Sequence, residues 1–247
     1  MNTQHKDMKF DEIESLVIHK ISRRLFNEAD ILSRRYAKRV FEKEVSKLSE
    51  EEVFSLMDKI TGGLGYRKGD FNIIRISYCG SLIAWPEVVK VNAKVLEIGT
   101  GIGRTCYAVV AWSKPSLYLT IDISPEIIAI ALYRNPVEAY RRALMNPCVK
   151  ICLCDAIKAI SVLPSGFFDH VIHDGGPNPN RNPSLYAYSF IRRLVNLIKN
   201  NGTISIFAGK NKYWQEKIYK ILKSLKLKVE SVAFPDSPVL VFHACKS

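Results

Sequence analysis

Hydrophobic residues recur at helical spacing over the first quarter of the chain. Apolar side chains fall three or four positions apart along residues 10–25 and again along residues 31–41. Ser49 and Glu52 have the spacing of a capping box ahead of a third such pattern, which Thr61-Gly62-Gly63 should end. We therefore predict that this region is mostly helical.

Residues 71–85 alternate poorly between apolar and polar positions. The segment is rich in β-branched and aromatic residues, Cys79-Gly80-Ser81 offers a turn, and Pro86 ends it. We predict a short β-hairpin. Helices followed by a hairpin could form a winged helix, but residues 50–60 are acidic where a DNA-reading helix should be basic.

From Lys94 onward, short apolar runs alternate with segments of helical period. Runs of strand length lie at 95–99, 117–122, 149–154, 169–174, 203–208, 227–234 and 238–244. Helical segments lie at about 103–112, 125–145 with a break around Asn135-Pro136, a short stretch to Leu163, 184–199 and 213–225. This order predicts an α/β fold: a Rossmann-like seven-stranded sheet with helices on both faces and an antiparallel last strand.

The first of these strands runs into a glycine-rich turn. Gly99, Gly101 and Gly103 occupy alternate positions, and Glu97 precedes them. A dinucleotide fingerprint spaces its glycines G-x-G-x-x-G, so the third glycine comes one position early here. A carboxylate at position 97 would repel a pyrophosphate, whereas it suits a cationic or hydroxyl-bearing ligand.

Three further acids fall at the ends of the next three strands. Asp122, Asp155 and Asp174 each end or follow an apolar run. Open α/β sheets bind ligands at the carboxyl ends of their strands, and a carboxylate can accept hydrogen bonds from both ribose hydroxyls. The glycine turn and these acids together predict a nucleotide-type cofactor site.

These motifs resemble the class I S-adenosylmethionine-dependent methyltransferases, whose first motif reads E/D-x-G-x-G-x-G. The resemblance covers about residues 94–247 and implies methyl transfer from S-adenosyl-L-methionine. It places Glu97 near the amino-acid end of the cofactor, Asp122 at the ribose and Asp155 at the adenine amine. The implied cofactor-binding residues are Glu97, Gly99, Thr100, Gly101, Gly103, Asp122, Ile123, Asp155 and Ala156.

A narrower resemblance links the chain to a group of predicted archaeal methyltransferases of unassigned substrate. It rests on His173-Asp174, on Ser184-Leu185-Tyr186 with Phe190 and Leu194, and on Asn201-Gly202 with Gly209. That group tends to have two prolines after the aspartate, where this chain has Gly175 and Gly176.

Asp174 is the candidate catalytic or substrate-positioning acid, although it could equally contact the cofactor or cap its loop. Arg181 could bind an anionic group of the substrate, and Tyr186 could supply an aromatic contact; both have ordinary structural alternatives. Enzymes that methylate exocyclic base amines often carry D/N-P-P-Y/F at this loop. The run Asp174-Gly175-Gly176-Pro177 lacks the following aromatic, which disfavours that reaction.

The composition suits one α/β domain with an extension. We expect residues 1–90 to form a helical extension, with the hairpin, that covers the substrate side, and residues 91–247 to form the cofactor-binding domain. The net charge is +12, and residues 185–247 carry eleven basic but three acidic residues. Lys217, Lys220 and Lys223 share one helix side, which slightly favours RNA as the acceptor over a protein or a small molecule; a solvated lysine face is the alternative.

No metal site is expected, because the six cysteines form no C-x-x-C pair and His170 and His173 lack ligand spacing on a strand. Cys152 and Cys154 are best explained as buried free thiols. We expect no membrane span and no signal peptide, and hence a cytoplasmic protein.

Two other functions stay open. An aminopropyltransferase has the same fold and binds decarboxylated S-adenosylmethionine, but its polyamine-binding acidic clusters are missing here, where Asp174 stands alone. A non-catalytic module that binds RNA or protein could keep a relic of the pocket. The intact glycine turn with Glu97 and Asp122 argues against such decay.

Overall fold

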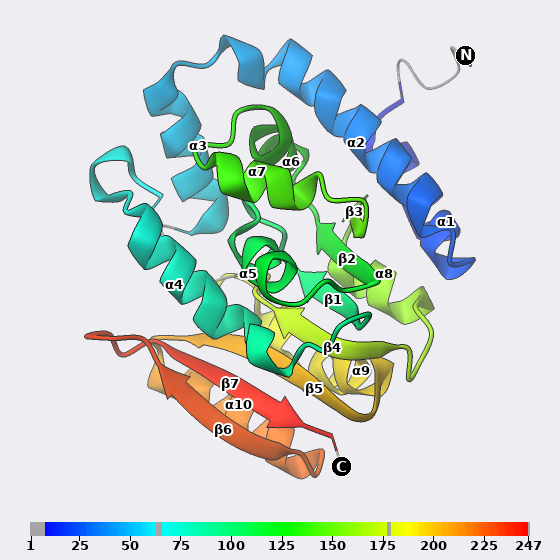
Figure 1. The fold of residues 1–247 in the computed structure, drawn as a ribbon, viewed down its shortest axis with the longest axis vertical. Coiled ribbons are helices and arrows are strands. Elements are labelled where there is room, and N and C mark those ends of the chain that lie inside the picture. The colour runs from blue at the N-terminus through cyan, green and yellow to red at the C-terminus, as the bar shows by residue number, and fades with distance from the viewer. Residues whose placement is uncertain (1–7, 63–65, 177–178, 247) are drawn as a thin grey trace.

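The computed structural model describes residues 8–62, 66–176 and 179–246. A single sheet with the strand order β3-β2-β1-β4-β5-β7-β6 forms its centre (Figure 1). The strands are β1 (Lys94–Ile98), β2 (Leu117–Asp122), β3 (Val149–Leu153), β4 (Phe168–His173), β5 (Ile198–Gly209), β6 (Lys228–Ala233) and β7 (Leu240–Cys245). The first five run parallel, while β7 is antiparallel to both β5 and β6. The predicted seven-stranded α/β sheet with an antiparallel last strand is confirmed.

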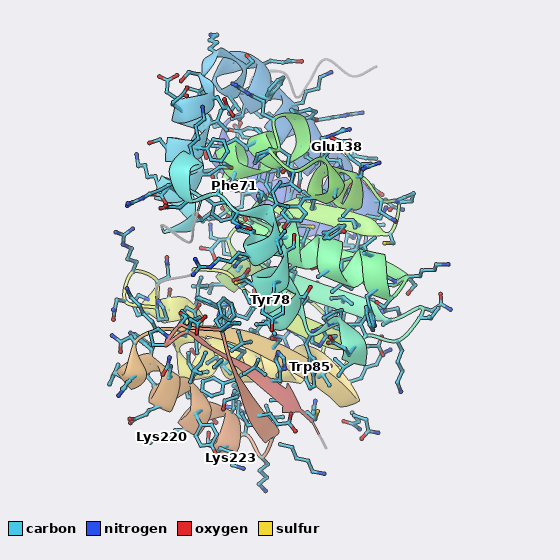
Figure 2. All side chains as sticks on the ribbon, turned by 60° about the vertical axis from the view of Figure 1, so that its left-hand side comes forward. Phe71, Tyr78, Trp85, Glu138, Lys220 and Lys223 are labelled. Atoms are coloured by element: carbon cyan, nitrogen blue, oxygen red, sulfur yellow. The ribbon has the colours of Figure 1, made fainter. Side chains whose placement is uncertain are left out.

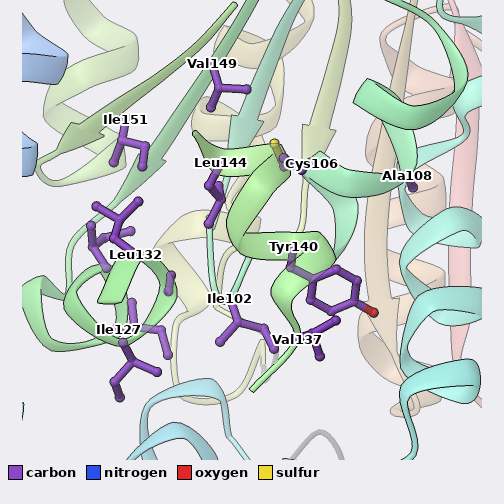
Figure 3. Close-up of a cluster of buried hydrophobic side chains, with 14 of the residues drawn as sticks. Ile102, Cys106, Ala108, Ile127, Leu132, Val137, Tyr140, Leu144, Val149 and Ile151 are labelled. Atoms are coloured by element: carbon purple, nitrogen blue, oxygen red, sulfur yellow. The ribbon is translucent and has the colours of Figure 1, made fainter. Parts of the chain in front are cut away.

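Helices cover both faces of the sheet (Figure 1). Those of the α/β part are α5 (Arg104–Trp112), α6 (Pro125–Tyr133), α7 (Glu138–Leu144), α8 (Ala156–Val162), α9 (Tyr188–Leu197) and α10 (Lys212–Ser224). Successive strand residues face opposite sides, so Val95 packs with α5, α6 and α7, whereas Leu96 packs with α8, α9 and α10. Figure 3 shows part of the first core, to which Ile102 contributes together with Tyr140 and Leu144 of α7.

The first part of the chain is helical, as predicted. It forms α1 (Phe10–Ser22), α2 (Phe26–Lys43) and α3 (Glu50–Thr61), with 3-10 turns at Val45–Lys47, Lys68–Asp70, Pro86–Val88 and, later in the chain, Pro183–Tyr186. The capping box is present, because the Ser49 hydroxyl accepts from the Glu52 backbone and Glu52 accepts from the Ser49 backbone. Gly62 adopts the left-handed conformation that ends α3.

The predicted β-hairpin is wrong, since residues Ile73–Ala84 form the helix α4. Ile76, Gly80 and Ile83 are buried at helical spacing, and α4 packs against α5. A Cβ atom at Gly80 would lie 3.1 Å from the carbonyl oxygen of Arg104, so the glycine serves a close helix contact and not a turn. Tertiary packing overrides the local β propensity here.

Side chains of α1 and α2 cover the free edge of β3. Three backbone N–H groups at this edge donate to helical side chains. The N–H of Ile151 donates to Asp30 at 2.8 Å and that of Leu153 to Ser33 at 2.9 Å. The N–H of Asp155, just beyond the strand, donates to Glu14 at 2.8 Å. An edge strand presents unpaired backbone donors at every second residue. Three helical side chains thus take the place of a further strand. No helix in the described parts of the chain is long and apolar enough to cross a membrane.

Candidate active site

A cavity of about 290 Å³ lies where the carboxyl ends of β1, β2, β3 and β4 meet. The predicted site residues that line it are Gly99, Thr100, Gly101, Asp122, Ile123, Asp155, Ala156 and Asp174. Ile60 and Thr61 of α3 and the following Tyr66 also line it, so the N-terminal region contributes one wall. The sheet therefore brings together residues that are up to about 75 positions apart in the chain.

The glycine turn takes the chain from β1 into α5 with a conformation that suits glycine. Gly99 and Gly103 have φ values of 91°, and Gly101 has a φ of 50°. The Gly99 N–H donates to the Ile121 carbonyl at 2.8 Å, which fixes the turn beside β2. Gly103 lies outside the cavity lining, and a Cβ atom there would meet Leu144 at 2.8 Å. Gly103 therefore permits packing, whereas Gly99 and Gly101 face the cavity.

Asp122 and Asp155 lie side by side at the ends of β2 and β3. The Asp122 carboxylate accepts from the backbone N–H of Gly101 at 3.1 Å and of Ser124 at 3.0 Å. Burial raises the pKa of Asp122, and these two hydrogen bonds oppose the shift. Asp155 caps α8 by accepting from Ile157 at 2.6 Å. Both carboxylates are held by the backbone while they line the cavity.

Glu97 lies beneath the cavity and does not line it. Its side chain is fully buried, with Thr105 donating to one carboxylate oxygen and Thr120 to the other at 2.6 Å. Burial raises the pKa of Glu97 to about 8, although these hydroxyl bonds lower it in part. The Thr120 hydroxyl also lies 2.7 Å from that of Thr100, which does line the cavity. Glu97 is thus linked to the cavity wall through the hydroxyls of Thr120 and Thr100.

Asp174 forms an ion pair with Arg104, a cavity residue that the sequence analysis did not single out. Arg104 Nη2 lies 3.0 Å from Asp174 Oδ2, and each side chain is 8% exposed. Burial raises the pKa of Asp174, against the pull of the Arg104 charge. Burial disfavours the charged form of Arg104 too, but the Asp174 carboxylate outweighs it and the Arg104 pKa is raised. In the sequence, the feature that could have identified Arg104 is its position as a basic residue directly after the glycine turn.

The other two loop candidates lie apart from the cavity lining. Arg181 is exposed. Tyr186 is fully buried, and its hydroxyl lies 2.9 Å from the Gly176 carbonyl and 3.2 Å from that of Gly175. His173 stacks on the Tyr186 ring at 4.7 Å, and burial lowers its pKa to about 4. Tyr186 and His173 therefore support the loop after β4 from below. Pro177, which follows these glycines, lies outside the described residues.

The lysines of α10 lie on the far side of the molecule from α3 (Figure 2). Lys220 and Lys223 are exposed, and Lys220 lies 3.8 Å from Glu216. Lys217 packs over the Trp214 ring at 4.4 Å. RNA binding at this surface stays a prediction. Among the described residues, no group of His, Cys, Asp and Glu is arranged to hold a metal ion.

Comparison with known proteins links about two thirds of the chain to one family. Residues 78–240 match the model of the spermine/spermidine synthase domain. This range contains the glycine turn and the three cavity acids.

Solved structures share the fold. A spermidine synthase in complex with the transition-state analogue AdoDATO has a TM-score of 0.60 and 19% identity, covering 70% of this chain and 61% of its own. The spermidine synthase from Thermotoga maritima has a TM-score of 0.57 and 19% identity, covering 70% and 60%. The chain thus spans about three fifths of the length of these relatives. No curated protein gives a significant match.

The family match corrects the expectation of methyl transfer. That expectation rests on the glycine turn and the strand-end acids, and residues 78–240, which match the family model, contain all of them. The matching family is one of aminopropyltransferases that share the methyltransferase fold, and S-adenosylmethionine is replaced by its decarboxylated form in that family. The alternative that the sequence left open is therefore the better one.

Proposed function

We propose that this chain, which belongs to the spermine/spermidine synthase domain family, transfers a 3-aminopropyl group from decarboxylated S-adenosylmethionine to an amine. The observation that carries the proposal is the family match over residues 78–240, because it spans every β-α unit that builds the cavity. The cavity supports it with three carboxylates around one space, which suits a donor that is cationic at its sulfonium and at its amine.

The adenosyl part of the donor belongs at the β2–β3 side of the cavity. Asp122 has free lone pairs for the ribose hydroxyls after accepting two backbone hydrogen bonds. Asp155 lies on the neighbouring strand end, within reach of an adenine amine, and Ile123 and Ala156 provide apolar contacts for the ring. The turn at Gly99 and Gly101 lets the backbone approach the donor closely.

The reaction is an in-line displacement at the carbon next to the sulfonium sulfur. The lone pair of the acceptor nitrogen forms the new C–N bond while the C–S electron pair returns to sulfur, which leaves 5′-methylthioadenosine. The nitrogen then releases one proton. The leaving group is already activated, so the protein mainly has to align the two substrates and exclude water. We assign to Asp174 the role of accepting hydrogen bonds from an amine at the β4 side. Burial raises the Asp174 pKa, and the Arg104 charge opposes this shift and favours the ionised form.

The test is the release of 5′-methylthioadenosine. Purified protein is incubated with decarboxylated S-adenosylmethionine and a panel of amines, and both products are quantified by chromatography and mass spectrometry. The proposal predicts 5′-methylthioadenosine and aminopropylated amine in equal amounts, and much less of both with an Asp122→Asn variant when the donor is subsaturating. Release of 5′-methylthioadenosine without any alkylated amine would count against it.

A further inference from the structure

The β4 side of the cavity contains a basic side chain to which the proposed reaction assigns no ligand. Arg104 is the first residue of α5, directly after the glycine turn, and it lines the cavity although its side chain is 8% exposed. Among the described residues that line the cavity, it is the only basic one. Its position is fixed from behind, because α4 approaches its backbone at Gly80.

Arg104 has hydrogen-bonding capacity to spare. Its side chain donates two hydrogen bonds to Asp174, both from Nη2, at 3.0 and 3.3 Å. Among the described residues, the side chain has no other hydrogen-bond partner. A guanidinium has five N–H donors in a planar fork, which matches the two oxygens of a carboxylate. Tyr66 lines the same end of the cavity, is 3% exposed, and has a hydroxyl group that can add one hydrogen bond.

The charge balance at this end favours a ligand that carries both signs. Asp174 is the acid at this side, and Arg104 already matches its charge. A simple diamine would bring an ammonium group against this buried pair and would compete with Arg104 for the one carboxylate. An amino-acid group brings an ammonium for Asp174 and a carboxylate for Arg104, so the four charges alternate and sum to zero. Buried charges are tolerated when they are paired and hydrogen-bonded in this way.

We infer that Arg104 binds a carboxylate of the acceptor, and that the acceptor is an amino acid with a second amine instead of a simple diamine. The inference rests on the proposed aminopropyl transfer. Asp174 and Arg104 would hold the amino-acid group, which leaves the second amine to attack the donor. Because Arg104 would bind the carboxylate that distinguishes an amino acid from a diamine, it is a specificity-determining residue for the acceptor.

The test compares two molecules that differ by one carboxylate. Ornithine and 1,4-diaminobutane are titrated calorimetrically into the protein saturated with 5′-methylthioadenosine, which occupies the adenosyl side. We expect ornithine to bind at least tenfold more tightly. The Arg104→Gln variant should lose that preference. Arg192→Gln is the matched control, because Arg192 is exposed on α9 away from the cavity and its replacement should keep the preference.

Two more variants cover the case in which Arg104→Gln does not fold, since it leaves the buried Asp174 uncompensated. Arg104→Lys keeps the charge without the planar fork, and Arg104→Gln combined with Asp174→Asn removes both charges. We expect the preference for ornithine to shrink in the first and to vanish in the second. Equal or tighter binding of 1,4-diaminobutane by the unmodified protein overturns the inference, as does a preference that survives these changes.

The failure of the inference is distinguishable from that of aminopropyl transfer. Turnover of 1,4-diaminobutane in preference to ornithine retains the proposed function and overturns the inference. If the unmodified protein binds S-adenosylmethionine more tightly than its decarboxylated form, and Arg104→Gln removes the difference, the carboxylate belongs to the donor and both proposals are overturned.

Discussion

Gly99 and Gly175 pack backbone against backbone at the floor of the cavity. A Cβ atom on Gly99 would lie 2.7 Å from the Cα atom of Gly175, and one on Gly175 would lie 2.7 Å from Ile98 Cγ2. Real side chains do not approach so closely, so the turn after β1 and the loop after β4 meet only because both positions lack a side chain. This contact places Asp174 next to the glycine turn.

Gly175→Ala should therefore separate the two loops. We expect an unfolding free energy lower by about 1–3 kcal/mol, the usual cost of overpacking, and weaker binding of 5′-methylthioadenosine. Urea denaturation measures the first effect and calorimetry the second. Gly69→Ala is the control, since a Cβ atom at Gly69 meets nothing within 4 Å, and it should stay within about 0.5 kcal/mol of the unmodified protein. Equal stability of the two variants would contradict the packing described.

The edge of β3 provides a second prediction. The Ser33 hydroxyl accepts from the Leu153 backbone, so Ser33→Ala leaves a buried N–H without a partner and should lower the unfolding free energy by about 1–3 kcal/mol. Ser15→Ala is a matched control, because both hydroxyls donate to the carbonyl four residues earlier and only Ser33 reaches a strand. Thermal denaturation of the two variants side by side decides it: similar midpoints would show that the edge contact has no energetic role.

Glu97 should make stability depend on pH. Its pKa is about 8 in the folded protein, against an ordinary value of 4.5. Above pH 4.5 the unfolded chain loses this proton while the folded chain keeps it, so the unfolded state binds fewer protons and stability falls as the pH rises toward 8. The stabilisation that the Glu97 pKa shift provides has its full value below pH 4.5. Urea midpoints measured from pH 5 to pH 8 should decline less steeply in Glu97→Gln than in the unmodified protein.

The control for that series is Glu230→Gln, because Glu230 is exposed on β6. It should reproduce the slope of the unmodified protein. If Glu97→Gln shows the unmodified slope as well, the buried carboxyl is not protonated in the folded state.

Asp122 is expected to bind the donor without being needed for the fold. Asp122→Asn keeps an oxygen for one of the two backbone hydrogen bonds but loses the charge, and hydrogen bonds to charged groups contribute about 1.5–3 kcal/mol. Affinity for 5′-methylthioadenosine should fall about 10- to 150-fold, as measured by calorimetry. Asp11→Asn on the exposed side of α1 should change nothing. An unaltered affinity in Asp122→Asn would show that Asp122 does not bind the donor.

From Lys94 onward, the order of strands and helices could be predicted from the sequence because apolar runs of strand length alternate with segments of helical period. The convergence of Asp122, Asp155 and Asp174 followed from the rule that parallel strands end at one edge of the sheet. The helix at residues 73–84 was not readable, since its composition favours β structure and the decisive contact, Gly80 on Arg104, comes from α5.

The contacts at the β4 side of the cavity could not be predicted from the sequence either. Nothing in the sequence pairs Arg104 with Asp174, which is 70 positions away, and the ion pair forms only once β4 lies beside β1. Tyr186 is a residue type that often contacts ligands. In this structure its ring is buried, and its hydroxyl donates to the loop carbonyls of Gly175 and Gly176. The glycine turn and the strand-end acids predict a nucleotide-type cofactor from the sequence, whereas the contacts of Arg104 and Tyr186 become visible only in the folded chain.

The most direct test of the central claim is a calorimetric comparison of donors. Decarboxylated S-adenosylmethionine and S-adenosylmethionine are titrated separately into the unmodified protein at the same pH and ionic strength. An aminopropyltransferase should bind the decarboxylated donor at least tenfold more tightly. Equal affinities, or tighter binding of S-adenosylmethionine, would contradict the function proposed for this chain.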